Sequence, residues 1–266
     1  MLKSIFLMLL TSVWTTVCFI LCCIAMLVTL DPGASIWIAR RLWSPLLLWA
    51  AGIRVEVEGL ENVDPKRPTI YASNHQSTAD IPVLFMALPV NVRFVAKKQL
   101  GYVPLVGWYL HLARYPLVDR GNRAKAIKSL EEAGRKVRNG VSIIVYPEGT
   151  RSDDGRVLPF KKGPFALALK ARVPICPVTI EGSGYCMAKN SWDIKRGVIR
   201  VKIGKPIDTA SYTEERRVEL MREVRTAIIH QSLEMGGKGG DLDDAVAEAG
   251  LEGIGRAAPL RQGRAS

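Results

Sequence analysis

The segment that decides the fold is the 20-residue stretch TIYASNHQSTADIPVLFMAL, which occupies residues 69–88. Its first part, Thr69 to Ala72, is short, apolar and β-rich and predicts a buried strand. Its last part, Ile81 to Leu88, is apolar on most sides and predicts a buried helix. The polar residues between them predict a loop that leads from strand to helix, which is the repeating unit of an α/β domain.

The same alternation of strands and helices extends over residues 54–235. The predicted strands are Arg54 to Glu58, Thr69 to Ala72, Val92 to Ala96, Ser142 to Tyr146, Ile175 to Ile180 and Ile199 to Ile203. The predicted helices are Ile81 to Leu88, Leu100 to Leu112, Arg123 to Arg138, and a last one that a capping box of Ser211 and Glu214 opens and that ends near Glu234. We therefore expect an α/β domain whose mixed sheet is flanked by helices.

The N-terminal region, residues 1–53, predicts membrane-anchoring helices. Ser4 to Leu30 contains no charged residue, and as a helix it would be about 40 Å long, more than the roughly 30 Å of a bilayer's hydrocarbon core. It can therefore span the membrane if it is tilted. A cleaved signal peptide is the alternative, but the apolar region of such a peptide is usually only about 7 to 15 residues long.

A second apolar stretch follows the helix break Asp31-Pro32-Gly33. Residues 36–53 mix Trp and Arg with apolar side chains, which is typical of a helix at the headgroup boundary, and Pro45 favours a bent or re-entrant shape as much as a straight one. Arg40 and Arg41 outnumber Lys3, so the positive-inside rule places the large body on the cytoplasmic face. A hairpin with both ends in the cytoplasm fits equally well.

The C-terminal region, residues 236–266, predicts a disordered tail, because it holds eight glycines and few large apolar residues. A short helix between Leu242 and Ile254 is the alternative.

The formal charge of +12 belongs to the body, since the tail has four Lys/Arg against five Asp/Glu. Such an excess suits an anionic membrane, an acidic substrate, nucleic acid or plain solvation. The apolar N-terminus favours the membrane, so we expect no nucleic-acid partner. The five cysteines have no zinc spacing, and no metal site is expected.

His75 and Asp80 form a candidate general-base pair. In a continuous helix, five residues turn through about 500°, so the two side chains would not share a face, but a strand-to-helix turn can bring them together. The carboxylate could then accept a hydrogen bond from one imidazole nitrogen and leave the other to take a proton from a hydroxyl. The structural alternative is a hydrogen-bonded histidine at a helix start, with the aspartate as an N-cap.

A second polar motif, Tyr-Pro-Glu-Gly-Thr-Arg-Ser, occupies residues 146–152 directly after an apolar strand. Its backbone amides, the hydroxyl of Thr150 and the guanidinium of Arg151 could gather around a phosphate at the strand's end. A tight turn with a surface pair of Glu148 and Arg151 is the alternative.

Four blocks in order along residues 69–180 are together specific. The catalytic block at 74–80 is followed by Ala96-Lys97-Lys98-Gln99-Leu100 with Pro104, Gly107 and Val118-Asp119-Arg120, then by the 146–152 motif, and then by Val173-Pro174-Ile175-Cys176-Pro177-Val178. This arrangement resembles the glycerolipid acyltransferase family, and within it the 1-acylglycerol-3-phosphate acyltransferases. The resemblance implies that His75 and Asp80 are catalytic. It implies substrate contacts for Arg120, Glu148, Gly149, Thr150 and Arg151, to which we add Lys97. One departure is Tyr146, where the family commonly has Phe, and we expect it to affect packing more than chemistry.

The resemblance implies an enzyme of phospholipid synthesis that needs no cofactor beyond its co-substrate, an acyl thioester of coenzyme A or of acyl carrier protein. His75 would deprotonate the sn-2 hydroxyl of 1-acylglycerol 3-phosphate (lysophosphatidic acid) as it attacks the thioester, and phosphatidic acid would form. One alternative is a related acyltransferase that acts on glycerol 3-phosphate, a lysophospholipid or a lyso-aminolipid. Others are a thioester hydrolase and a non-enzymatic basic membrane-binding protein.

Overall fold

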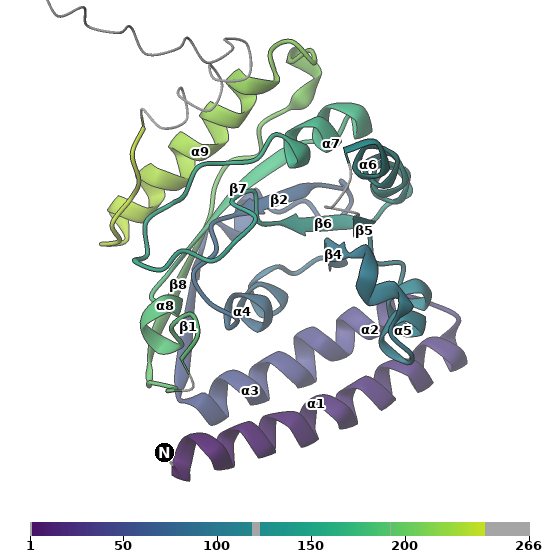
Figure 1. Ribbon diagram of the computed structural model, residues 1–266, viewed down its shortest axis with the longest axis vertical. Helices are drawn as coiled ribbons and strands as arrows, with labels where there is room; N and C mark the ends of the chain where they lie inside the picture. Colours follow the sequence, from purple (N-terminus) through teal and green to yellow (C-terminus); the bar gives the residue numbers. More distant parts are fainter. Residues whose placement is uncertain (1, 119–122, 192, 243–266) are drawn as a thin grey trace, which may run out of the picture.

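The computed structural model describes residues 2–118, 123–191 and 193–242, and its centre is one mixed sheet (Figure 1). The sheet has the strand order β1-β8-β7-β2-β6-β3. Its strands are β1 (Ile53–Glu58), β2 (Ile70–Ser73), β3 (Val92–Phe94), β6 (Ser142–Val145), β7 (Ile175–Glu181) and β8 (Gly197–Ile203). Only the β7 and β8 pair is antiparallel; the other neighbours run parallel. The predicted mixed α/β sheet is therefore confirmed.

Helices cover both faces of the sheet (Figure 1). One face packs on α6 (Arg123–Arg138), α7 (Gly163–Ala171) and α9 (Arg217–Glu234). The other packs on α4 (Asp80–Ala87). Side chains that alternate along a strand supply both cores: in β2, Ile70 and Ala72 belong to the first and Tyr71 to the second. Burial on both faces explains why the central strands β2, β6 and β7 are mainly apolar.

A helical hairpin lies beyond α4, at the bottom of Figure 1. Its first arm is α1 (Leu2–Thr29), and its second arm is the continuous run of α2 (Gly33–Ile38), a π-helical turn (Ala39–Trp43) and α3 (Ser44–Ala51). Pro45 does not break this second arm. The π-turn places Pro45 in the first turn of α3, where the hydrogen bond that proline cannot donate is not needed. The helix therefore continues to Ala51, and Gly52, with φ of +70°, turns the chain into β1.

Three local predictions were wrong. Residues 100–112 are not one helix: a 3-10 helix (Lys98–Tyr102) is separated from α5 (Val106–Leu112), because Pro104 cannot continue a helical turn. The strand predicted from residue 92 stops at Phe94, and the chain re-pairs as β4 (Ala96–Lys97) with β5 (Leu117–Val118) in a separate two-stranded sheet.

The capping box is absent at the start of α9. Ser211 ends a 3-10 helix (Thr209–Ser211), where its hydroxyl donates to the carbonyl of Asp208, and α9 begins only at Arg217. The remaining short elements are a 3-10 helix (Leu60–Asn62) and α8 (Ser183–Cys186).

The packed part of the chain continues past the predicted boundary at residue 235. The hydroxyl of Ser232 accepts a hydrogen bond from the backbone N–H of Gly239, and Gly239 in turn accepts one from the N–H of Val157. The buried guanidinium of Arg225 donates to the carbonyls of Val157 and Asp241. Residues 236–242 therefore tie α9 to the loop after the 146–152 motif. The rest of the predicted tail lies outside the described residues.

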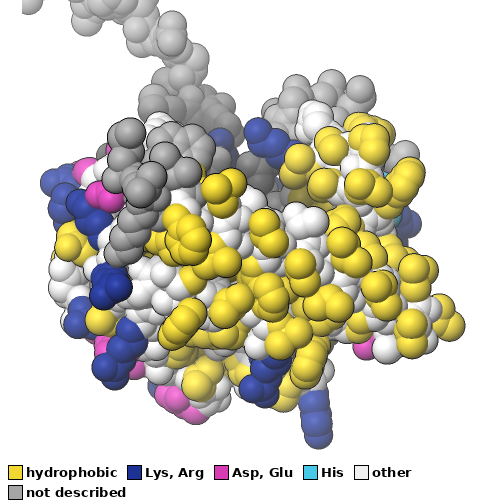
Figure 2. Space-filling view, turned by 90° about the horizontal axis from the view of Figure 1, so that it is seen from below, with side chains coloured by type: hydrophobic (Ala, Val, Ile, Leu, Met, Phe, Trp, Pro, Cys, Tyr) yellow, Lys and Arg dark blue, Asp and Glu magenta, His cyan; other side chains and the backbone are white. Residues whose placement is uncertain are grey.

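The hairpin presents a hydrophobic surface on its outer side. In α1, the segment Phe6–Thr29 has a mean hydropathy of 2.3, and only 17% of its most apolar stretch is buried. It is long and apolar enough to cross a membrane. Figure 2, which views the molecule from below, shows hydrophobic side chains over most of this face and Lys and Arg mainly toward its edges. A layer of basic groups around an apolar face suits the boundary between lipid chains and headgroups.

Candidate active site

His75 and Asp80 meet at the turn between β2 and α4. The Nδ1 atom of His75 lies 2.7 Å from the Oδ2 atom of Asp80. The Asp80 side chain is fully buried, and 17% of the His75 side chain is exposed. The predicted strand-to-helix turn therefore brings the two side chains together. With Nδ1 held by a carboxylate, Nε2 is the imidazole nitrogen that remains to accept a proton.

Asp80 is fixed by the backbone of the turn that it closes. Its Oδ2 atom also accepts hydrogen bonds from the N–H groups of Gln76, at 2.9 Å, and Ser77, at 3.0 Å. Asp80 is the first residue of α4, but its side chain points back to the preceding loop and does not cap the helix. These bonds fix the position of the carboxyl group beside the imidazole, and the Nδ1 atom of His75 can donate to it in the tautomer that carries the proton there.

The 146–152 motif holds the backbone of His75 on both sides. The N–H of His75 donates to the Oε1 atom of Glu148 at 3.2 Å, and its carbonyl accepts from the N–H of Ser152 at 2.8 Å. Glu148 is buried, and its other oxygen has no partner among the described residues. Burial raises the pKa of the Glu148 carboxyl to about 8. Glu148 is thus placed to position the catalytic turn, and its predicted contact with an acceptor stays a prediction.

Tyr146 stacks on the imidazole of His75. The ring centroids are 3.8 Å apart and the planes differ by 11°. No local pattern in the sequence indicates this contact, because a tyrosine at a strand end usually packs in a core. The Tyr146 hydroxyl is buried and has no partner among the described residues. The departure from the family pattern is therefore in direct contact with the ring of His75.

Asn74 and Gln76, on either side of His75, anchor the turn to the neighbouring strand β7. The side-chain amide of Asn74 donates to the carbonyl of Ile180 at 2.9 Å and accepts from its N–H at 2.8 Å. The Gln76 amide donates to Glu181 at 3.1 Å. The position of these polar residues beside the histidine was the only sequence signal for this role.

An apolar cavity of about 460 Å³ opens beside His75. Its walls include the aromatic rings of Phe94 and Tyr146, together with Ile81, Ile144, Val145, Val118 and Leu167. The cationic side chain of Lys161 lines the same cavity, next to Gly149. The cavity therefore combines a long apolar wall, an imidazole and a positive charge, which is a suitable environment for an amphiphile with an anionic head.

The predicted substrate contacts are distributed around this cavity in different ways. Gly149 lines it, and its φ of +74° forms the turn that Lys161 covers. Thr150 is exposed and Arg151 is half-buried after the same turn. Lys97 is exposed at the end of β4. Arg120 lies outside the described residues. Lys161 is one of several lysines that the sequence offered for a phosphate without ranking them, and it is the one that lines this cavity.

Comparisons with known proteins agree with this architecture. The model of a family described as Acyltransferase matches residues 54–181. A 1-acyl-sn-glycerol-3-phosphate acyltransferase from Saccharomyces cerevisiae is 36% identical over 203 residues, which are 75% of this chain and 67% of the relative. One from Limnanthes alba is 39% identical over 172 residues, 64% of this chain and 60% of the relative. The chain thus spans less than two thirds of that plant protein.

A solved structure has the same fold. The crystal structure of the 1-acyl-sn-glycerophosphate (LPA) acyltransferase PlsC from Thermotoga maritima matches with a TM-score of 0.74 and 29% sequence identity. The match covers 88% of this chain and 95% of that one, so it includes the helices outside the sheet as well as the α/β core.

Proposed function

Because this chain belongs to the acyltransferase family, we propose that it transfers a fatty acyl group from an acyl thioester to the sn-2 hydroxyl of 1-acylglycerol 3-phosphate and so forms phosphatidic acid. The proposal takes its acceptor from the names of the relatives. The observation that carries it in this molecule is the 2.7 Å contact of His75 with Asp80 at the mouth of an apolar cavity.

In the proposed reaction, the Nε2 atom of His75 takes the proton of the sn-2 hydroxyl as its oxygen attacks the thioester carbonyl. Asp80 stabilises the imidazolium that forms. The tetrahedral intermediate then collapses, the C–S bond breaks, and the leaving thiolate takes the proton from the imidazolium. The acyl group passes directly to the acceptor, so no covalent acyl-enzyme is needed.

Recognition of the acceptor is proposed to centre on the turn at Gly149. Lys161 covers this turn and lines the cavity of His75, so its ammonium group is placed to bind the phosphate. Thr150, Arg151 and Lys97 lie on exposed or half-buried surface from which they could reach the same headgroup. The acyl chain of the lysolipid would occupy the apolar wall beside Phe94.

The membrane is the proposed location. The outer side of α1 exposes apolar side chains, and its inner side packs on the second arm of the hairpin and on α5 through Cys18, Cys22 and Met26. Since the second arm leads directly to β1 of the sheet, a hairpin that inserts would carry the α/β domain with it. We therefore propose that the hairpin lies in the lipid surface, with the catalytic domain on the cytoplasmic face as the Arg40 and Arg41 excess predicts.

The test is acylation of 1-acylglycerol 3-phosphate by the detergent-solubilised full chain, with acyl-coenzyme A and acyl-carrier-protein thioesters compared as donors. We expect phosphatidic acid from the wild type and none above background from His75→Ala. Activity restricted to another lysolipid would identify that lipid as the acceptor. Thioester cleavage without added lysolipid would indicate a hydrolase. No reaction with any acceptor, and no difference between wild type and variant, would contradict the proposal.

A further inference from the structure

Residues 98–112, which we call the lobe, expose an unusual number of large hydrophobic side chains. Seven are more than a third exposed: Leu100, Tyr102, Val103, Leu105, Val106, Trp108 and Leu112. Trp108 is 69% and Tyr102 73% exposed. The lobe contains no Asp or Glu. A contiguous apolar surface of this kind usually marks an interaction site.

The backbone of the lobe keeps these side chains outside. Leu105 has φ of +65° and ψ of −55°, and the N–H of Val106 donates to the carbonyl of Pro104 at 2.7 Å. This is a γ-turn with positive φ, a rare and strained conformation that is usually kept for a functional reason. A Cβ atom on Gly107 would come within 2.2 Å of the carbonyl oxygen of Gly101, so the two halves of the lobe are closely packed. The backbone of the lobe is therefore held in one shape, with these side chains exposed.

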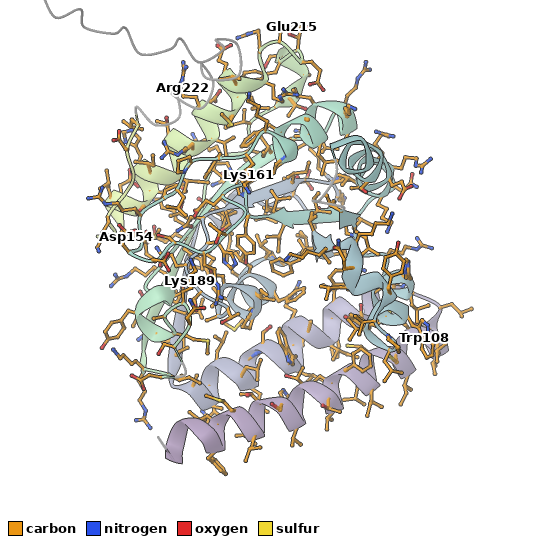
Figure 3. All side chains as sticks on the ribbon, in the orientation of Figure 1. Trp108, Asp154, Lys161, Lys189, Glu215 and Arg222 are labelled. Atoms are coloured by element: carbon orange, nitrogen blue, oxygen red, sulfur yellow. The ribbon has the colours of Figure 1, made fainter. Side chains whose placement is uncertain are left out.

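The lobe is joined to the outer hairpin. The ring of Tyr109, on the inner side of α5, packs on Phe19 of α1 with centroids 5.2 Å apart. The buried guanidinium of Arg93 donates both to the carbonyl of Ala113, at the end of α5, and to that of Pro32, in the turn of the hairpin. Figure 3 shows Trp108 at the outer edge of the molecule, beside the turn end of the hairpin. The exposed side of the lobe therefore continues the apolar face of α1.

The lobe also connects to the cavity beside His75. Its two stems are β4 and β5, which pair with each other. Phe94 and Val95, just before β4, and Val118, in β5, line the cavity. Residues 94–118 therefore form the exposed apolar lobe in their middle and part of the wall of the cavity beside His75 at their two ends.

We propose that the lobe inserts into the same lipid leaflet as α1 and is the entry through which the acyl chain of the acceptor passes from the membrane to the cavity beside His75. This inference rests on the proposed function for its second half, the passage of substrate. Insertion of the lobe stands on the exposed side chains and their continuity with α1 alone.

A lipid surface fits the lobe better than a second copy of the chain or another protein. The apolar tip is continuous with a helix long enough to cross a bilayer, so a protein partner would have to cover both. Exposed Tyr and Trp are the side chains that prefer the membrane interface. Lys98, at the base of the lobe, is placed to meet anionic headgroups.

Insertion can be tested by quenching of tryptophan fluorescence. The full-length protein is bound to vesicles of phosphatidylcholine with phosphatidic acid, with or without bromine atoms on the phosphatidylcholine chains. The emission of Trp108 is the difference between the emission of the wild type and that of Trp108→Phe. We expect the brominated chains to quench most of this difference. The matched control is Leu233→Trp in the Trp108→Phe background, because Leu233 is 54% exposed on α9, across the sheet from the hairpin. Its emission should stay unquenched. Bound protein with unquenched Trp108 would overturn the proposal.

Passage of substrate is tested by Trp108→Glu. The ratio of activity on a long-chain lysolipid in vesicles to activity on a short-chain, water-soluble one should fall about tenfold, because a charged side chain at this position opposes insertion of the lobe into lipid. Leu233→Glu should leave the ratio unchanged. An unchanged ratio in Trp108→Glu would contradict the entry route while leaving the proposed reaction intact. Quenching of Trp108 in a chain without transferase activity would contradict the proposed reaction and leave insertion of the lobe intact.

Discussion

The carboxyl group of Glu148 accepts a hydrogen bond from the backbone N–H of His75, so a residue of one motif helps to position a residue of another. The contact joins positions 73 residues apart, and Glu148 is buried. A positioning role for Glu148 can be tested, because it differs from that of a group in direct contact with substrate.

Two substitutions of Glu148 distinguish a need for its hydrogen bond to His75 from a need for its negative charge. Glu148→Ala leaves the N–H of His75 without an acceptor, which costs about 1–3 kcal/mol, so we expect a lower melting temperature and a large loss of kcat. Glu148→Gln keeps an acceptor oxygen and should retain most of the activity. If Gln were as damaging as Ala in both thermal melting and kcat, the negative charge of Glu148, and not its hydrogen bond, would be required.

The same pair predicts a pH dependence of stability. Burial raises the folded-state pKa of Glu148 to about 8 from an ordinary value of 4.5, so the folded state binds the extra proton between these values. The stabilisation is full below about pH 4.5 and is lost as pH rises through about 8. The wild type should therefore lose stability relative to Glu148→Gln over this window, by an amount on the order of a few kcal/mol. Melting curves of both proteins at several pH values measure it; parallel curves would contradict the prediction.

Asp80→Asn tests the tautomer of the catalytic imidazole. The amide is the same size as the carboxylate, but it no longer holds the proton on Nδ1 by charge. We expect kcat to fall roughly 10²- to 10⁴-fold, with a smaller change in KM. A variant with nearly full kcat would mean that Asp80 only stabilises the turn, which the melting temperature of the same protein would report.

Tyr146→Phe should stabilise the protein by about 1 kcal/mol, because it removes a buried hydroxyl without a partner and keeps the stacked ring. Tyr146→Ala removes the ring that supports the imidazole of His75 and should lower kcat at least about tenfold. Urea unfolding and initial rates of both variants provide the comparison. A loss of stability in Tyr146→Phe would show that the hydroxyl has a partner in solution.

Gly149→Ala should weaken acceptor binding. At φ of +74° an alanine costs about 1–2 kcal/mol, and its Cβ would lie 2.9 Å from the Nζ and Cε atoms of Lys161, so the lysine has to move. Gly140→Ala is the matched control, since Gly140 also has positive φ and has no atom within 4 Å of the added Cβ. Both variants should lose similar stability, but only Gly149→Ala should raise KM for the lysolipid. If Gly149→Ala and Gly140→Ala had the same KM for the lysolipid, Lys161 would not be part of the acceptor site.

Much of this arrangement could be predicted from local sequence. The stretch at residues 69–88 predicted its strand, loop and helix because each has its own pattern of apolar and polar residues. The meeting of His75 and Asp80 followed from the turn between them. What could not be predicted depends on contacts between distant segments. The stacking of Tyr146 on His75, the bond from His75 to Glu148 and the position of Lys161 over Gly149 have no local pattern.

The structure of the lobe could not be predicted from the sequence for a different reason. Residues 100–112 are apolar on most sides, and this pattern cannot show that Pro104 and the strained backbone at Leu105 divide the stretch into two pieces. The sequence therefore predicted one helix where the structure has a 3-10 helix and α5.

The double hydrogen bond between the Asn74 side chain and the backbone of Ile180 bears on how such a chain can diversify. The side-chain amide of Asn74 makes the two hydrogen bonds to Ile180 that the backbone of a further β2 residue would make, so the turn leaves the sheet at one fixed position. An insertion there would leave the backbone N–H and carbonyl of Ile180 buried without hydrogen-bond partners. His75 and Asp80 are consequently hard to alter by changes in length. Substitutions in the lobe or in the cavity wall near Phe94 leave this pair of bonds in place, so new lipid preferences can arise there while the proposed base pair is inherited unchanged.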